Sequence, residues 1–127
     1  RAQSIDYLIE GTRALAGTAY PFDEVGTRRL AEQDFDRAHN FASAPNHFQV
    51  GGGEALLGRL GEIAAPLLVL HGTEDPMLSK QHAIEFTERV PGTTLVWLEG
   101  VGHELPEPAW DTVIAAIARH TDDARRG

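Results

Sequence analysis

Cysteine is missing from this chain of 127 residues, and its absence removes three kinds of chemistry at once. Without thiols the chain can form no disulfide framework, no thiolate zinc site and no cysteine nucleophile. Lysine is almost as scarce, with Lys80 as its single occurrence, and acidic side chains outnumber basic ones by 19 to 11. Because nucleic-acid affinity depends on clustered cations, a net charge of −8 argues against a nucleic-acid partner.

Long apolar runs are absent as well. No stretch approaches the ~20 residues that a membrane-spanning helix requires, so we expect no membrane partner. The first residues, RAQSIDYLIEG, lack the layout of a signal peptide. These features together lead us to expect a cytoplasmic protein. The length is sufficient for one hydrophobic core and too short for two ordinary domains.

The first half of the sequence has a helical texture. Apolar spacing predicts a helix over residues 2–16 and a second helix that begins after an N-cap at Asp23 and ends near His39. A loop rich in aromatic residues is expected over 41–53, followed by a short helix around 56–63. Nothing in this half shows the alternation of a strand.

After Pro66, two apolar runs alternate with two amphipathic segments. Residues 67–70 and 94–98 predict strands that are buried on both faces, and helices are expected over 79–90 and from Pro106 onward. The side chains expected to face inward are Ala83, Ile84, Phe86 and Val90 on the first helix and Trp110, Val113, Ile114 and Ile117 on the second. This order predicts an α/β fold with parallel strands, in a sheet that needs more than two strands.

An acid and an imidazole follow the two predicted strands. Asp75 lies in the loop HGTEDP and His103 in the loop EGVGHE. Because parallel strands end at the same edge of a sheet, we expect these side chains to lie close together. An Asp that accepts from one imidazole nitrogen leaves the other free to take a proton from a nucleophile. The glycines on either side of Val101 are expected to let the backbone turn and present His103.

The segments LLVLHGTEDP and LVWLEGVGHELP resemble the last two strands of the α/β-hydrolase fold with their acid and histidine loops. The resemblance covers residues 66–120 and implies that Asp75 is the triad acid and His103 the triad base. The segment YPFDE and the lid length are most similar to the branch that includes esterases, proline iminopeptidases and aclacinomycin methylesterase. The resemblance further implies a helical lid over 1–60 and the C-terminal part of the hydrolase core over 61–127.

The nucleophile of that family has no counterpart here. There is no G-x-S-x-G motif, and Ser4, Ser43 and Ser79 do not follow a predicted strand. The resemblance therefore implies the C-terminal segment of a serine-type hydrolase, inactive alone, whose nucleophile and oxyanion hole lie outside this chain. Two alternatives stay open: a hydrolase with an Asp nucleophile, of the dehalogenase or epoxide hydrolase type, and a non-catalytic interaction module.

Other residues have secondary roles in this interpretation. Glu74 is a rival for the acid, and His71 is expected to be packed and hydrogen-bonded near the site rather than catalytic. Phe41, His47 and Phe48 are candidates for binding the substrate, expected to be a small-molecule ester or amide. The resemblance implies no cofactor, and the histidines lack metal-site spacing. We also expect an exposed sheet edge that binds the missing N-terminal half of the hydrolase or a second copy.

Overall fold

The computed structural model describes residues 1–126 as two compact units. The first unit consists of Arg1–Ala14 and Phe22–Leu57, and the second of Leu15–Pro21 and the chain from Gly58 onward. The short segment 15–21 is thus grouped with the second half of the chain rather than with the helices that flank it in sequence. The lid boundary expected at residue 60 stays a prediction.

The first unit is built on two helices, α1 (Ala2–Leu15) and α2 (Glu24–Arg37), as the apolar spacing predicted. The Asp23 side chain caps α2 by accepting from the backbone N–H of Gly26 at 2.9 Å. The core of this unit is formed by Ile5, Ile9 and Ala31. Because the two apolar residues of α1 are four apart, they lie on one face of the helix and pack together.

The predicted loop over 41–53 is wrong in part. Residues Phe41–Gln49 form a 3₁₀ helix, η1, in which the Asn40 side chain accepts from the N–H of Ala42. The short helix expected around 56–63 is present, but it too is a 3₁₀ helix, η2 (Glu54–Glu62). No residue of η2 is buried. Most helical stability in proteins comes from packing an apolar face, so η2 has little support for an extended α-helix.

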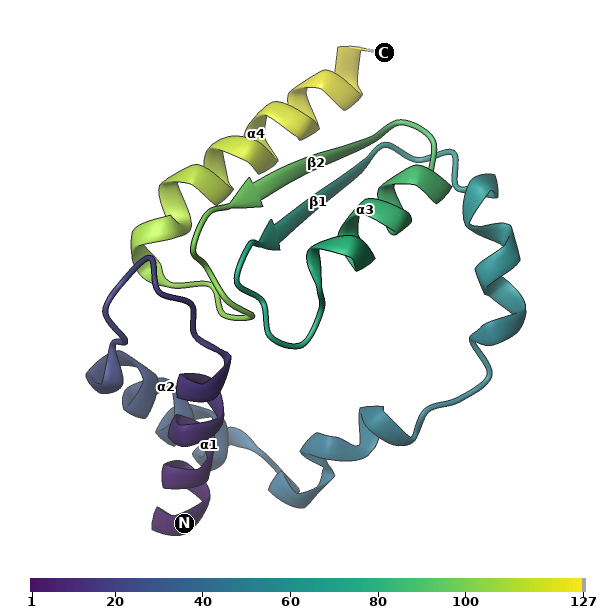
Figure 1. Cartoon of the computed structure of the whole chain (residues 1–127). Helices are drawn as coiled ribbons and strands as arrows, with labels where there is room; N and C mark the ends of the chain where they lie inside the picture. Colours follow the sequence, from purple (N-terminus) through teal and green to yellow (C-terminus); the bar gives the residue numbers. More distant parts are fainter. Residues whose placement is uncertain (127) are drawn as a thin grey trace. The chain divides into compact units, whose positions relative to one another are not determined.

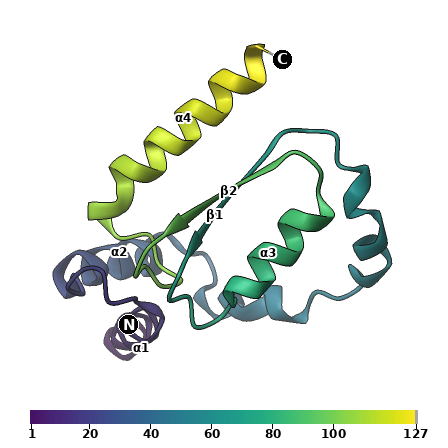
Figure 2. The same ribbon diagram turned by 45° about the horizontal axis from the view of Figure 1, so that its top comes forward.

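The second unit contains the strand–helix–strand–helix order that the sequence predicts. Its elements are β1 (Leu67–Gly72), α3 (Lys80–Arg89), β2 (Thr93–Leu98), the single 3₁₀ turn η3 (Glu107–Ala109) and α4 (Trp110–Arg126). The strands are parallel, with a register that runs from Leu67 opposite Thr93 to Gly72 opposite Leu98. Figures 1 and 2 show α3 on one face of this sheet and α4 on the other, with both strands ending on the same side.

The burial predicted for this unit is only partly right. The core joins Leu98, Val101, Ala109 and Val113, with Leu70 packed against them, and Ala83 and Val90 of the α3 region are buried. The run Leu67–Leu70, however, is half-buried along its length rather than buried on both faces. A sheet of two strands is narrow, so the side chains on its two faces do not become fully buried.

The apolar stripe of α4 was expected to face inward, and three of its four residues do not. Trp110, Ile114 and Ile117 are each 46% to 60% exposed, and Ile84 of α3 is also exposed at 36%. Val113 is buried as expected, and Ala116, which was not predicted, is buried with it. A stripe wide enough for a large sheet cannot be covered by two strands, so part of it stays in solvent.

Within residues 1–126, no helix combines the length and the apolar character that a membrane crossing demands. The expected cytoplasmic location stays a prediction.

Candidate active site

Asp75 and His103 lie side by side at the edge where both strands end. The Nδ1 atom of His103 is 2.7 Å from Oδ2 of Asp75, a hydrogen-bond distance. The Asp75 side chain is only 6% exposed, whereas that of His103 is 38% exposed. The structure thus brings together the two residues that the sequence placed after successive strands. The carboxylate of Asp75 is therefore enclosed, whereas the imidazole of His103 is partly exposed.

The two oxygens of the Asp75 carboxylate have different partners. Oδ1 accepts from the backbone N–H groups of Met77 at 2.8 Å and Leu78 at 2.9 Å, which forms the turn after β1. Oδ2 faces the imidazole of His103. A carboxylate can only accept, so the contact requires the proton on Nδ1 and leaves Nε2 of the neutral ring as an acceptor. That tautomer is the one a general base needs.

The environment of Asp75 favours its charged form. Burial by itself raises the pKa of this carboxyl, but the hydrogen bonds from His103, Leu78 and Met77 outweigh burial, and the net pKa lies below its ordinary value. The anion is therefore stabilised by the same contacts that hold the imidazole in place.

This shift predicts how stability depends on pH. Because the pKa of Asp75 is lower in the folded chain than the ordinary 3.8 of the unfolded one, the contribution is complete above pH 3.8. It is lost as the pH falls through the folded value. Urea unfolding of the wild type and of Asp75→Asn should therefore show a stability gap at pH 7 that shrinks under acid conditions. A gap of constant size from pH 7 to pH 2 would contradict this account.

Glu74, the rival acid, is occupied elsewhere. Its carboxylate accepts from the backbone N–H of Thr18 at 2.8 Å and from the Thr18 hydroxyl at 2.9 Å. The contact with His103 is made by Asp75 instead. Both residues lie in the turn that follows β1, and the path of the backbone through this turn sends their side chains in different directions.

His71 is packed near the site, as predicted. It is 8% exposed, its Nε2 donates to the backbone carbonyl of Leu78 at 3.0 Å, and its ring meets Trp97 edge-on at 5.6 Å. The backbone N–H of Leu78 donates to Asp75, so the N–H and the carbonyl of Leu78 both help to hold the turn. His71 therefore stabilises the loop that carries the acid.

A third segment at this edge was not foreseen. Residues Leu15–Ala19, here named the crossing segment, form hydrogen bonds with the histidine loop. The N–H of His103 donates to the Leu15 carbonyl at 2.8 Å, and the N–H of Ala19 donates to the Gly100 carbonyl at 2.8 Å. In the sequence this region shows only a turn signal from Gly17 to Pro21, which does not indicate what a turn will contact.

Glycine is required at positions 100 and 102 of the histidine loop for two different structural reasons. Gly100 has φ of +67°, a conformation that side chains rarely adopt, as the turn prediction required. Gly102 is needed for space instead, because a Cβ there would collide with the Leu15 carbonyl and crowd the N–H of Gly17. The crossing segment is thus pressed directly against the backbone beside His103.

The residues expected to bind substrate lie in η1 of the first unit. Phe41 packs against Phe35 with ring centroids 5.0 Å apart, and the His47 and Phe48 rings are 4.0 Å apart. The side chain of Phe48 is largely exposed. Their role in substrate binding stays a prediction.

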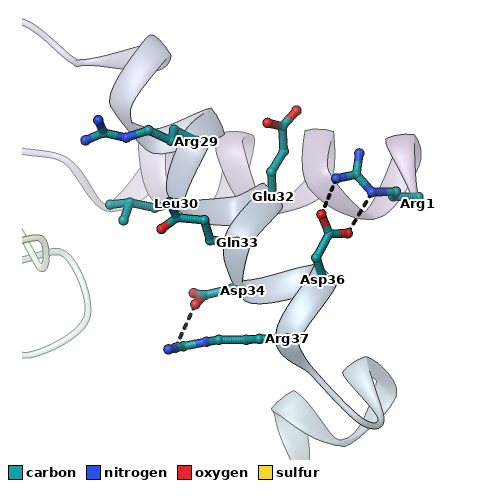
Figure 3. A pocket seen from close by; sticks show the side chains of 8 residues that line it. All are labelled: Arg1, Arg29, Leu30, Glu32, Gln33, Asp34, Asp36 and Arg37. Atoms are coloured by element: carbon teal, nitrogen blue, oxygen red, sulfur yellow. Dashed lines mark hydrogen bonds and ion pairs between the residues drawn. The ribbon is translucent and has the colours of Figure 1, made fainter.

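Two open pockets are lined by other residues. A pocket of about 860 Å³ lies along α2 and includes Arg1, which holds Asp36 through two hydrogen bonds (Figure 3). A second, of about 440 Å³, lies between the sheet and α4, with Leu68 and Val96 at its apolar side and His120 among its polar residues. Neither includes Asp75 or His103. Across the described residues, no group of three or more His, Asp or Glu side chains is arranged to hold a metal ion.

The three serines occupy positions unlike a nucleophile elbow. Ser4 lies within α1 and Ser43 within η1, where its hydroxyl donates to the Asn40 carbonyl. Ser79 caps α3 by accepting from the N–H of His82. None of them follows β1 or β2 directly, which is the place that the strained strand-to-helix turn occupies.

The chain is similar in sequence to one protein family and to several known proteins. Residues 25–107 match the family described as serine aminopeptidase, S33. The chain is 31% identical over 114 residues to rhodomycin D methylesterase DauP of Streptomyces sp. (strain C5) and 30% identical over 114 residues to rhodomycin D methylesterase DnrP of Streptomyces peucetius. Each alignment covers 89% of this chain and 38% of the relative. A shorter match, 35% identical over 48 residues, is to human α/β-hydrolase domain-containing protein 17C and covers 37% of this chain and 15% of that protein. The chain therefore spans well under half the length of these relatives.

Proposed function

This chain belongs to the serine aminopeptidase, S33 family of α/β-hydrolases, and from that premise we propose that it carries the acid and the base of a serine-type hydrolytic site. The observation that supports the proposal most directly is the 2.7 Å contact between Asp75 and His103. In this assignment His103 is the general base and Asp75 orients it. The substrate is an ester or amide, and the methylesterase names of two relatives favour an ester.

The proposed reaction follows from the tautomer. Nε2 of His103 takes the proton of a serine hydroxyl as its oxygen bonds to the substrate carbonyl carbon. The resulting imidazolium is stabilised by Asp75, and it returns the proton to the alcohol or amine that leaves. A water molecule then gives a proton to Nε2 as its oxygen attacks the acyl-enzyme. Nε2 passes that proton to the serine oxygen as the acid is released, which restores the serine.

We further propose that the nucleophile and the oxyanion N–H groups are supplied by residues outside this chain. None of its three serines directly follows a strand. The chain alone is then inactive toward esters, while a hydrolase that contains it together with a strand–serine–helix turn is active.

A fluorophosphonate probe tests the proposal, because it reacts with an activated serine. In a hydrolase that contains this chain, labelling is expected and should be lost in His103→Ala. The matched control is His82→Ala, since His82 is an exposed histidine on α3. Ester turnover without labelling would point to an Asp nucleophile. A folded protein with neither labelling nor turnover would favour the non-catalytic interaction module.

The open edge of β1 supports a proposal about partners. Among the described residues, β1 pairs with β2 alone, so its other side has unpaired backbone groups. We expect the chain by itself to self-associate through this edge, with the population of dimers rising with concentration in light scattering. Leu67→Lys, which puts a charge on the edge strand, should favour the monomer, whereas Glu88→Lys on exposed α3 should not. A wild-type chain that is monomeric at all concentrations would contradict the proposal.

A further inference from the structure

We propose that Glu104 is a positioning residue for His103, and that it acts by anchoring the crossing segment against the histidine loop. Nothing in the family match or in the relatives' names assigns a role to this carboxylate. The inference rests on the proposed function, since it treats His103 as the base whose orientation matters. Its basis is a set of contacts within the second unit of the chain.

Two consecutive residues hold the crossing segment. The backbone N–H of His103 donates to the Leu15 carbonyl at 2.8 Å. The side chain of Glu104 then accepts from the N–H of Gly17, with its two oxygens 3.0 and 3.2 Å from that nitrogen. The contacts run in opposite directions, from loop to segment and from segment to loop. Together they restrict the backbone on both sides of His103, which sets the direction in which its ring points.

The fit between the two backbones is too close to tolerate displacement. A Cβ on Gly17 would collide with the Gly100 carbonyl and the N–H of Gly102, and a Cβ on Gly102 would collide with the Leu15 carbonyl. Since both positions are glycine, the segment and the loop approach at backbone distance. A small shift of either one would therefore break the hydrogen bonds of Leu15 and Gly17.

Glu104 has no other bonding role in the described part of the chain. No cation there forms an ion pair with it, and its carboxylate is half-buried against the N–H of Gly17. The carboxylate of Glu104 loses part of its hydration in this position, which costs free energy. The charge-assisted hydrogen bond from the N–H of Gly17 offsets that cost. Glu74 forms the equivalent contact from the acid loop, to Thr18. The crossing segment is thereby tied to both loops of the site.

The test uses the full chain labelled with ¹⁵N and measures three quantities: the imidazole nitrogen shifts of His103, the hydrogen exchange of the Gly17 amide, and the urea midpoint. In Glu104→Ala we expect Gly17 to exchange about tenfold faster or more, as loss of a charge-assisted hydrogen bond implies. We expect the His103 imidazole to change from the single Nδ1–H tautomer of the wild type to a mixture of tautomers.

Glu104→Gln should restore most of the wild-type imidazole signal, because its amide oxygen can still accept from Gly17. Glu88→Ala, an exposed residue of α3, is the control and should leave the imidazole signal unchanged. Two results would overturn the proposal: a wild-type imidazole protonated at Nε2, or a Glu104→Ala imidazole identical to wild type although Gly17 exchanges faster. Because these signals need no nucleophile or substrate, they can hold or fail independently of the hydrolase assignment.

Discussion

Replacing His103 by Ala, in a hydrolase that contains this chain and a serine nucleophile, should lower kcat by roughly 10⁶-fold. The variant removes the group that takes the serine proton, so the hydroxyl must attack without a base. Asp75→Asn should cost about 10⁴-fold, because an amide can donate to Nδ1 and so favours the wrong tautomer. Steady-state kinetics on an ester substrate measures both effects, and KM should change far less than kcat.

Two further variants distinguish loss of the general base from a general loss of activity. His82→Ala, on the exposed side of α3, should keep wild-type turnover. The double variant of Asp75 and His103 should be scarcely slower than His103→Ala alone, since the two residues act as one unit. Near-normal turnover by a folded His103→Ala enzyme would refute the assignment. Fully additive losses would refute the coupling between the two residues.

Gly72→Ala is expected to destabilise the second unit strongly. A Cβ at the end of β1 would collide with the carbonyl oxygens of Val101 and Gly102, which are backbone atoms that cannot rotate away. Overpacking of this kind typically costs about 1–3 kcal/mol in the free energy of unfolding. It would also push apart the two loops that bring Asp75 to His103. Urea unfolding and the imidazole shifts of His103 measure these two consequences separately.

Gly58→Ala provides a matched control. Gly58 lies in η2, with no atom within 4 Å of the position that a Cβ would take. The same change in chemistry should therefore alter stability by no more than about 0.5 kcal/mol. Equal effects at the two positions would show that the close approach of the loops at Gly72 has no energetic weight.

Local patterns in the sequence were enough to predict that Asp75 and His103 lie together. The apolar runs located β1 and β2, and the geometry of parallel strands then placed Asp75 beside His103. The same reasoning failed for α4, where a wide apolar stripe indicated burial for Trp110, Ile114 and Ile117. Periodicity shows that a face is apolar but does not show how much surface is available to cover it.

The choice between Glu74 and Asp75 also needed the structure. Both are acids in the same loop, and composition alone cannot separate them. Asp75 forms the turn through Met77 and Leu78 and keeps its second oxygen for the imidazole, whereas Glu74 holds Thr18. The backbone path of one turn decided which carboxylate reaches His103.

The sequence by itself determined the order of the elements, the parallel sheet and the pairing of an acid with a histidine at its edge. These features arise from contacts between near neighbours or from the direction of strands, and both leave a regular pattern along the chain. Only the tertiary structure decided that Leu15 and Gly17 lie against His103 and Glu104, far away in the sequence. Such hydrogen bonds join backbone atoms that every residue has, so they leave no periodic trace in the amino-acid order.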